Sequence, residues 1–396
     1  MSEHEQTKLE TDSGLPHVLV LASWYPSHYR PLEGIFIQEQ VRLLSDYVQL
    51  GVVYPEMRSL RALRLGALGK QHAQFSEGLE YGFPTYRWHG WNVPVEAIQS
   101  QIFLKPALEL VRRYVARYGV PDVFHAHATF WAGLAAYEAA KRYSKPYAVT
   151  VHWNGFMNYT FSNYKQSMAT KILGNAARVV SVSDALAESL YPYTKVAVED
   201  PIRVVHNPID TEHFTLPPKP RVRGEAYHVV SVAGLNEVKN LHILIEAFAE
   251  AFPENAKLTL GGEGPERGRL EALIAERGLG KRVTLLGGLD KHQILELLWQ
   301  ADLFASTSRT ETFGMAIAEA LATGLPVVAT RSGGPESIIK AGMGYLVEHD
   351  VKSVAAGLKR ASTTIFDAAK LREAIVERYS SSVIAKTLFE LYDGLR

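Results

Sequence analysis

The chain has no cysteine among its 396 residues. This absence excludes disulfide bonds, cysteine nucleophiles and cysteine-ligated zinc, and it agrees with a reducing compartment. An excess of charge of one sign is also missing, because 42 Lys and Arg residues balance 42 Asp and Glu residues. Net charge therefore does not favour nucleic acid or an anionic membrane as a partner.

Long apolar runs are absent as well. No stretch approaches the roughly 20 apolar residues that a membrane-spanning helix needs. Residues 1–16, MSEHEQTKLETDSGLP, lack the basic start and apolar stretch of a secretory signal. We expect residues 1–16 to form a disordered tail and the protein to be cytoplasmic. Any work at a membrane would then be done from its surface, at the inner face of the cell membrane.

Short apolar runs rich in Val and Ile alternate with longer segments of helical periodicity, such as 33–47 and 128–143. These runs have the pattern of buried parallel strands. They cover residues 17–22, 48–54, 122–127, 147–152, 178–183, 228–233, 257–262, 282–287, 302–306 and 326–330. The alternation predicts the α/β class with doubly wound parallel sheets.

The length favours two domains over one core. The strand rhythm stops at 211–226, where three prolines and clustered charges predict a linker. We therefore expect Rossmann-like domains at 17–210 and 227–376, with 377–396 as a C-terminal helix that returns to the first domain. Ligands of such sheets bind outside the carboxyl ends of the strands, so we expect the two domains to face each other across a cleft.

Two glutamates, Glu311 and Glu319, flank a Phe-Gly-Met turn that leads into an Ala-rich helical pattern. Eight residues of α-helix span about 12 Å and turn by about 800°, so these carboxylates would not share a face. The carboxylates of a glycoside hydrolase lie closer together, at about 5 to 9.5 Å. We therefore expect no hydrolytic pair. The spacing suits the two ends of one elongated ligand, with Glu311 in a loop and Glu319 on a helix.

The turn itself would present free backbone amides and the positive end of a helix dipole, which favour phosphate. Gly314 leaves room for a phosphate to approach the backbone. The carboxylates at either end are acceptors for sugar hydroxyls. A ligand with hydroxyls, a pyrophosphate and hydroxyls again is a nucleotide sugar. On spacing alone, a helix-start charge and a solvated surface charge explain the two glutamates equally well.

The block 306–338, STSRTETFGMAIAEALATGLPVVATRSGGPESI, resembles the donor-site signature of the retaining glycosyltransferases of family 4, in which seven residues separate two glutamates. Further segments resemble the family in the same order, at 125–133, 151–155, 181–190, 204–214, 232–248 and 261–272. The resemblance implies the GT-B fold. It also implies a hexosyltransferase of polysaccharide biosynthesis that uses a UDP- or GDP-linked donor. The acceptor would be a hydroxyl of a glycan, a lipid-linked molecule or a small molecule.

The resemblance also implies roles for single residues. Glu311 would contact hydroxyls of the donor sugar, and Glu319 would hold the ribose. The amides of Phe313, Gly314 and Met315 would meet the sugar and the pyrophosphate, in agreement with the helix-start argument.

Lys239 matches the phosphate-binding lysine of the family and would supply a positive charge to the leaving diphosphate. Here the sequence departs from the pattern, because the usual arginine before this lysine is replaced by Gly234. Arg309 and Arg331 are the candidates for the missing second cation. The alternative role for Lys239 is that of a surface lysine before a helix.

The first domain would contribute a glycine and a histidine. Gly34 lies in a loop that approaches the donor phosphates and the acceptor in the family, where a Gly-Gly pair is usual. His152 matches the histidine beside the donor sugar. Together with Lys239 and Glu311 it completes the expected catalytic residues. We expect His125 and His127 to alternate across a strand end, so that at most one faces the cleft, and we expect no metal ligation by them.

Asp-x-Asp is missing from the chain, which argues against the metal-clamped diphosphate of the other main transferase fold. We therefore expect a metal-independent enzyme that needs no cofactor, the nucleotide sugar being its donor substrate. No nucleophile is placed for a double displacement. The expected mechanism is a front-face one, in which the leaving diphosphate assists deprotonation of the acceptor.

Three segments are candidates for contacts with the acceptor or a membrane. Residues 88–94 and 152–164 are dense in aromatics and amides, which suit sugar faces as well as ordinary packing. Residues 57–70 place Arg58, Arg61, Arg64 and Lys70 among leucines, a basic amphipathic pattern that favours peripheral membrane contact or a solvated helix face.

Three other functions stay open. A nucleotide-sugar epimerase shares the architecture but converts its donor without an acceptor. A non-catalytic nucleotide-sugar-binding partner protein is compatible with the missing arginine. An NAD-dependent oxidoreductase is disfavoured, since Gly262-x-Gly264 lacks the third glycine of the dinucleotide motif.

Overall fold

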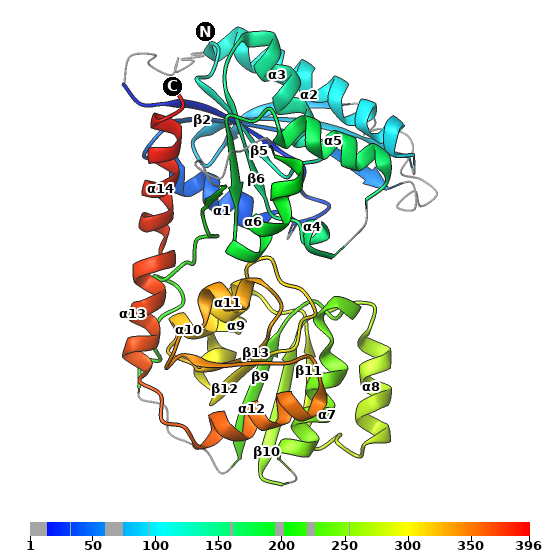
Figure 1. The fold of residues 1–396 in the computed structure, drawn as a ribbon, viewed down its shortest axis with the longest axis vertical. Coiled ribbons are helices and arrows are strands. Elements are labelled where there is room, and N and C mark those ends of the chain that lie inside the picture. The colour runs from blue at the N-terminus through cyan, green and yellow to red at the C-terminus, as the bar shows by residue number, and fades with distance from the viewer. Residues whose placement is uncertain are drawn as a thin grey trace, which may run out of the picture. The chain divides into compact units, whose positions relative to one another are not determined.

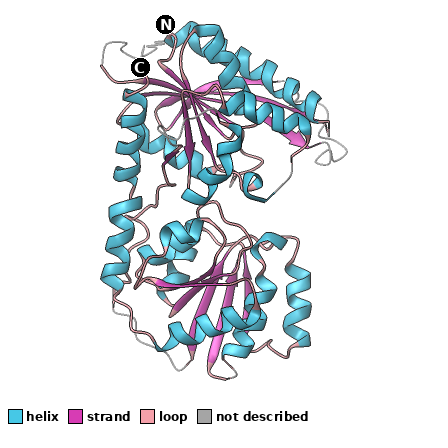
Figure 2. Cartoon of the chain, in the orientation of Figure 1, coloured by secondary structure: helices cyan, strands magenta, loops and turns pink. Residues whose placement is uncertain are grey.

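Two doubly wound α/β units make up the chain in the computed structural model (Figures 1 and 2). The structure describes residues 14–31, 33–59, 74–93, 95–158, 161–194, 202–219, 226–252 and 254–396. The first unit comprises residues up to Val182, Ala187–Val205 and Ile384–Arg396, and the second comprises Ser183–Leu186 and His206–Val383. The predicted tail, 1–16, lies almost wholly outside the described residues.

The first unit is built on a sheet of order β3-β4-β2-β1-β5-β6-β7-β8, in which only the β3–β4 pair is antiparallel. Its strands are β1 (His17–Ala22), β2 (Gln49–Ser59), β3 (Gln74–Glu80), β4 (Phe83–Asn92), β5 (Val123–His127), β6 (Tyr147–Val151), β7 (Arg178–Ser181) and β8 (Arg203–Val204). Its helices are α1 (Ile35–Leu44), α2 (Glu96–Tyr118), α3 (Ala132–Tyr143), α4 (Gly155–Asn158), α5 (Asn163–Leu173) and most of α6 (Asp184–Leu190), followed by the 3-10 turn η2 (Tyr191–Tyr193).

Strands β1, β5 and β6 are buried along their whole length, as near-continuous apolar runs in parallel sheets require. Helices α2 and α3 pack on the sheet, and α1 packs with α14 (Ser381–Asp393) over another part of the core. Ile384, Leu388 and Tyr392 of α14 belong to the same core cluster as Val18 of β1. Residues 384–396 therefore complete the first unit.

The second unit has a fully parallel sheet of order β11-β10-β9-β12-β13-β14. Its strands are β9 (Tyr227–Val232), β10 (Ala256–Gly261), β11 (Val283–Gly287), β12 (Leu303–Ser306), β13 (Val327–Thr330) and β14 (Gly344–Val347). Its helices are α7 (Leu241–Ala251), α8 (Arg267–Glu276), α9 (Lys291–Trp299), α10 (Met315–Ala322), α11 (Gly334–Ile338), α12 (Val351–Thr363) and α13 (Ala368–Tyr379), with the 3-10 turn η3 (Glu237–Lys239). Order 3-2-1-4-5-6 is that of dinucleotide-binding sheets.

The division between the units falls at Val205/His206, before the predicted linker 211–226. Residues 211–219 are part of the second unit because Arg372 on α13 holds them. Its guanidinium donates to the carbonyls of Thr211, Phe214 and Ala322 at 2.6–3.0 Å. The first half of the predicted linker is therefore anchored.

Four strands were not expected from the sequence, namely β3, β4, β8 and β14. Strand β3 is exposed along most of its length, and β8 has only two residues, so neither carries a buried apolar run. The turn between β3 and β4 places Tyr81 at φ 52° and Gly82 at φ 88°. Two successive positive φ values match the twist of a tight hairpin.

Candidate functional site

In the second unit, two loops meet where the strand order reverses. Strands β9 and β12 are neighbours, while β10 follows on the far side of β9 and β13 on the far side of β12. The loop after β9 contains η3, which ends at Lys239, and the loop after β12 contains Glu311 and leads into α10. Ligands of doubly wound sheets bind at this point, outside the carboxyl ends of the strands.

The structure brings Lys239 and Glu311 into direct contact. The Lys239 Nζ donates to Glu311 Oε1 at 2.5 Å, and the Ser308 hydroxyl donates to the same oxygen at 2.8 Å. Both charged side chains are partly buried, with 24% of Lys239 and 17% of Glu311 exposed. Lys239 is therefore not a solvated surface lysine, and a cation and a carboxylate share one site.

Hydrogen bonds between the two loops explain this contact. The amide of Arg309 donates to the Val238 carbonyl at 2.8 Å, and the Thr307 hydroxyl lies 3.2 Å from the carbonyls of Lys239 and Asn240. These bonds fasten the start of the β12–α10 loop to η3. Ser308 was missed in the sequence, although a hydroxyl three residues before a glutamate can reach its carboxylate.

The β12–α10 loop is also bound on its other side. The Glu311 amide donates to the Ser332 carbonyl at 2.9 Å, and the Glu311 carbonyl accepts from the Gly334 amide at 2.8 Å. A side chain at Gly334 would come within 2.2 Å of the Phe313 carbonyl oxygen, so only glycine allows this approach. The backbone of Glu311 is thus fixed between two neighbouring loops.

Helix α10 begins at Met315, directly after Gly314 at φ 104°. Within the described part of the chain, the amides of Phe313, Gly314, Met315 and Ala316 have no hydrogen-bond acceptor. The Phe313 ring is buried against Tyr379 at 5.3 Å between ring centroids. The side chain thus anchors the turn, while the helix start presents the orphan donors that can bind an anion.

Glu319 lies on α10 and is partly exposed, whereas Glu311 lies in the loop before the helix. The two glutamates therefore lie on different elements. Their contacts with a ligand stay predictions.

The two candidates for the second cation lie in different loops. Gly234 itself is exposed and bears no charge. Arg309 pairs with Glu237 on η3 at 3.6 Å, and Arg331 pairs with Glu348 at 3.3 Å. Because the backbone of Arg309 is bound to Val238 next to Lys239, Arg309 adjoins the Lys239–Glu311 pair through the loop itself.

In the first unit, Gly34 precedes α1 at φ 71°. A side chain there would come within 2.5 Å of the Trp24 carbonyl oxygen, and both observations require glycine. This close approach packs the end of the β1–α1 loop onto its beginning. Gly34 thus shapes the loop, and its contact with a donor stays a prediction.

Three histidines cluster after β5 and β6. The expectation that His125 and His127 lie on opposite faces is wrong, since residues two apart on a strand share a face, and their ring centroids are 4.4 Å apart. His127 Nδ1 lies 3.0 Å from His152 Nε2, and the two rings are stacked. The three side chains are buried. His127 was missed as a neighbour of His152.

A charged cluster in the first unit was also missed. Glu56 on β2 is fully buried and pairs in register with His89 on β4. Its carboxylate accepts from Ser27 at 2.7 Å and lies 2.6 Å from His89 Nδ1 and 3.2 Å from Arg58. Although burial alone would raise it, hydrogen bonds from His89 and Ser27 and the charge of Arg58 lower the pKa of Glu56 to about 2.

The aromatic residues of 152–164 pack largely on one another. Phe130, Trp153, Phe156 and Phe161 have ring centroids 4.9–6.4 Å apart, and the three phenylalanines are buried. Ordinary packing accounts for these rings. Sugar stacking by this segment has no support in these contacts.

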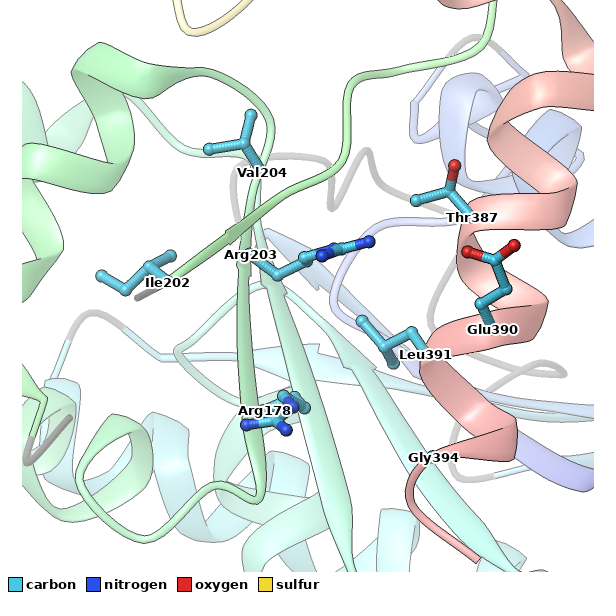
Figure 3. Close-up of a pocket in the computed structure, with 8 residues that line it drawn as sticks. All are labelled: Arg178, Ile202, Arg203, Val204, Thr387, Glu390, Leu391 and Gly394. Carbon is cyan, nitrogen blue, oxygen red and sulfur yellow. The ribbon is translucent and has the colours of Figure 1, made fainter. Parts of the chain in front are cut away.

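A cavity of about 550 Å³ lies elsewhere in the first unit, between β7, β8 and α14 (Figure 3). The Arg203 side chain extends toward Thr387 and Glu390 of α14. The lining residues are Arg178, Ile202, Arg203, Val204, Thr387, Glu390, Leu391 and Gly394. None of the predicted site residues belongs to this cavity.

Of the basic segment 57–70, residues 60–70 lie outside the described part of the chain. Arg58 is described, and its guanidinium bonds to Glu56 and lies over the Tyr29 ring at 3.7 Å. Arg58 therefore faces the protein. No helix in the described ranges is long and apolar enough to cross a membrane, and no three or more His, Asp or Glu side chains gather there as metal ligands.

Comparison with known proteins decides the family. Residues 213–378 match the model for glycosyl transferases group 1, and residues 69–213 match the model for glycosyltransferase family 4. The chain is a family-4 glycosyltransferase. The match covers both units, and the predictions of an enzyme and of the GT-B fold are confirmed.

Three similar proteins illustrate the relationship. A human protein of the phosphatidylinositol N-acetylglucosaminyltransferase is 30% identical over 64% of this chain, which spans about half (52%) of that protein. A Bacillus subtilis protein named for teichuronic acid biosynthesis, TuaC, is 27% identical over 81% of this chain and 82% of its own length. The structure of Anabaena HepE with UDP and glucose superposes with a TM-score of 0.73 at 19% identity, over 96% of this chain and 100% of that one.

Proposed function

We propose that this glycosyltransferase moves a sugar from a UDP-linked donor to a hydroxyl of a lipid-linked, glycan or small-molecule acceptor, with retention of anomeric configuration. The observation that carries the proposal is the Lys239–Glu311 pair at the switch point of the second sheet, beside the open start of α10. The solved HepE structure with UDP and glucose supports UDP as the nucleotide. The human relative, named for phosphatidylinositol, supports a lipid acceptor.

The ion pair also suggests how donor binding starts. A diphosphate that reaches the start of α10 competes with Glu311 for the Lys239 ammonium. Once Lys239 turns to the phosphate, the Glu311 carboxylate is released to accept hydrogen bonds from sugar hydroxyls. Each side chain therefore holds the other until a ligand carrying both groups replaces the pair.

The chemistry then follows from charge stabilisation. As the sugar–phosphate bond breaks, negative charge grows on the leaving diphosphate, and Lys239 and the amides of Phe313 to Met315 stabilise it. A phosphate oxygen takes the proton of the acceptor hydroxyl while that hydroxyl attacks the same face of the sugar. Arg309, whose backbone adjoins Lys239, is our candidate for the second cation.

Transfer assays test the function. UDP- and GDP-linked glucose and N-acetylglucosamine are incubated with phosphatidylinositol vesicles or soluble glycans, with and without EDTA, and the anomeric configuration of the product is read by NMR. We expect transfer from a UDP sugar that EDTA does not abolish. Conversion of the donor sugar without acceptor would identify an epimerase, and tight binding without turnover would identify a non-catalytic binding protein.

Single substitutions test the division of roles. Glu319→Ala should weaken UDP binding about tenfold or more, whereas Glu311→Ala should leave UDP binding nearly unchanged and lower transfer strongly. The exposed Glu276 on α8 supplies a control, and Glu276→Ala should change neither. Equal loss of UDP binding in the two site variants would contradict the proposed roles. Arg309→Ala should weaken UDP binding more than Arg331→Ala.

A further inference from the structure

The buried histidines of the first unit form a chain of contacts that ends at His152. The rings of His125 and His127 lie 4.4 Å apart on one face of β5, and His127 stacks on His152 with 5.3 Å between ring centroids. Phe36 contacts the His152 ring as well, at 4.8 Å. His125 and His127 are fully buried, and His152 is 8% exposed. His127 therefore reaches substrate only through His152.

Burial fixes the protonation of these rings. It lowers the pKa of His127 well below its ordinary value, with the neighbouring histidines adding to the effect, and lowers the pKa of His125 to about 3. Both are thus neutral at physiological pH. A neutral imidazole has one N–H donor and one acceptor nitrogen.

The hydrogen-bond partners differ between the two rings of β5. His125 contacts the Tyr392 hydroxyl with Nδ1 at 2.6 Å and the Thr150 hydroxyl with Nε2 at 2.7 Å. Since hydroxyls donate or accept, either tautomer of His125 is satisfied. His127 has one such partner: Nδ1 lies 3.0 Å from His152 Nε2, and Nε2 has none in the described part of the chain.

This asymmetry selects a tautomer. With its hydrogen on Nε2, His127 would bury an N–H donor without an acceptor, at a cost of about 1–3 kcal/mol. With its hydrogen on Nδ1, His127 donates to His152 Nε2. The Nε2 of His152 then acts as acceptor, so the hydrogen of a neutral His152 lies on Nδ1.

We propose that His127 is a positioning residue that holds His152 in the Nδ1–H tautomer, so that His152 serves the reaction as a hydrogen-bond donor. The catalytic consequence rests on the proposed function, in which His152 borders the donor sugar. A donor suits a sugar hydroxyl or phosphate oxygen as its partner. In this tautomer the nitrogen that could act as a base is already occupied by His127.

The tautomer is measured directly on the full-length protein. Long-range 1H–15N correlation of 15N-histidine-labelled protein distinguishes Nδ1–H from Nε2–H, and His152→Gln assigns the signals of His152. We expect Nδ1–H for His152 in the wild type. In His127→Phe, which keeps a ring but has no donor, the fixed tautomer should be lost. A wild-type spectrum showing Nε2–H on His152 would overturn the inference.

Kinetics supply the second readout. His127→Phe should lower kcat/KM for transfer about tenfold or more with UDP affinity within about twofold of wild type, and His127→Asn, which retains an N–H donor, should recover part of the loss. His125→Phe is the matched control. It removes an equally buried ring on the same face of β5 that does not contact His152 through a hydrogen bond, so the His152 signals should stay unchanged.

The two proposals fail separately. Nδ1–H on His152 in a protein without transferase activity would refute the proposed function and leave the positioning role intact. Transfer activity with Nε2–H on His152, or an unchanged His152 tautomer in both His127 variants, would refute the positioning role alone.

Discussion

Replacement of Glu56 by Gln tests how strongly one buried carboxylate stabilises the first unit. In the folded state its pKa is about 2, against an ordinary value of 4.5, and the side chain is fully buried. A tenfold change in proton affinity corresponds to about 1.4 kcal/mol. The ionised Glu56 therefore contributes about 3 kcal/mol to the free energy of unfolding at neutral pH.

The sign fixes the pH dependence. Because folding lowers the pKa, the contribution is fully present above the unfolded value of about 4.5 and is lost as the pH falls toward about 2. We expect Glu56→Gln to lower the unfolding free energy by about 3 kcal/mol at pH 7 and by only about 1 kcal/mol at pH 3.

Urea unfolding followed by tryptophan fluorescence measures this difference. Of the six tryptophans only Trp299 belongs to the second unit, so a Trp299→Phe background makes the signal specific for the first unit. Using one unit's signal also avoids treating a two-unit chain as a single two-state transition.

Glu109 provides the matched control. Hydrogen bonds from Arg112 and Arg113 lower its pKa to about 2 as well, yet its side chain is 30% exposed on a helix surface. Solvent screens such pairs, so Glu109→Gln should cost less than about 1 kcal/mol. Equal costs for the two variants, or a Glu56→Gln effect that does not change with pH, would refute the reasoning.

Three further substitutions have expected effects on stability. Gly34→Ala should destabilise the first unit by more than about 1 kcal/mol, measured by urea unfolding, because φ 71° and the Trp24 carbonyl oppose a side chain; an unchanged midpoint would contradict this. Arg372→Ala should lower the thermal stability of the second unit by about 2 to 3 kcal/mol, since three backbone carbonyls lose a charged donor, and faster proteolysis at 211–219 should accompany it. Tyr392→Phe should cost about 1 kcal/mol by removing the bond to His125 without changing packing, and hydrogen exchange at β5 reports it.

The ten strands expected from apolar runs are all present, with bounds shifted by a residue or two except for β2. That strand continues to Ser59, beyond its apolar run, because its end pairs with β4. Strand β4 was missed because its partner β3 is an exposed edge strand, and because the hairpin turn uses Tyr-Gly in place of the usual Asn-Gly signal. Local patterns identify buried strands well and edge strands poorly.

The candidate site was predicted in part. The helix start at Met315 followed from the Gly-Met turn and the Ala-rich pattern, which are local signals. The contact between Lys239 and Glu311 spans 72 positions of sequence, and that between His127 and His152 spans 25. Such contacts depend on strand order and register, which single-sequence periodicity does not contain.

The position of α14 bears on how the chain is made. Ile384, Leu388 and Tyr392 complete the core begun by β1, although the whole second unit is translated between them. During synthesis the first unit therefore waits, with part of its apolar interior uncovered, until residue 392 has left the ribosome. The second unit can close first, so the order of folding would run opposite to the order of translation.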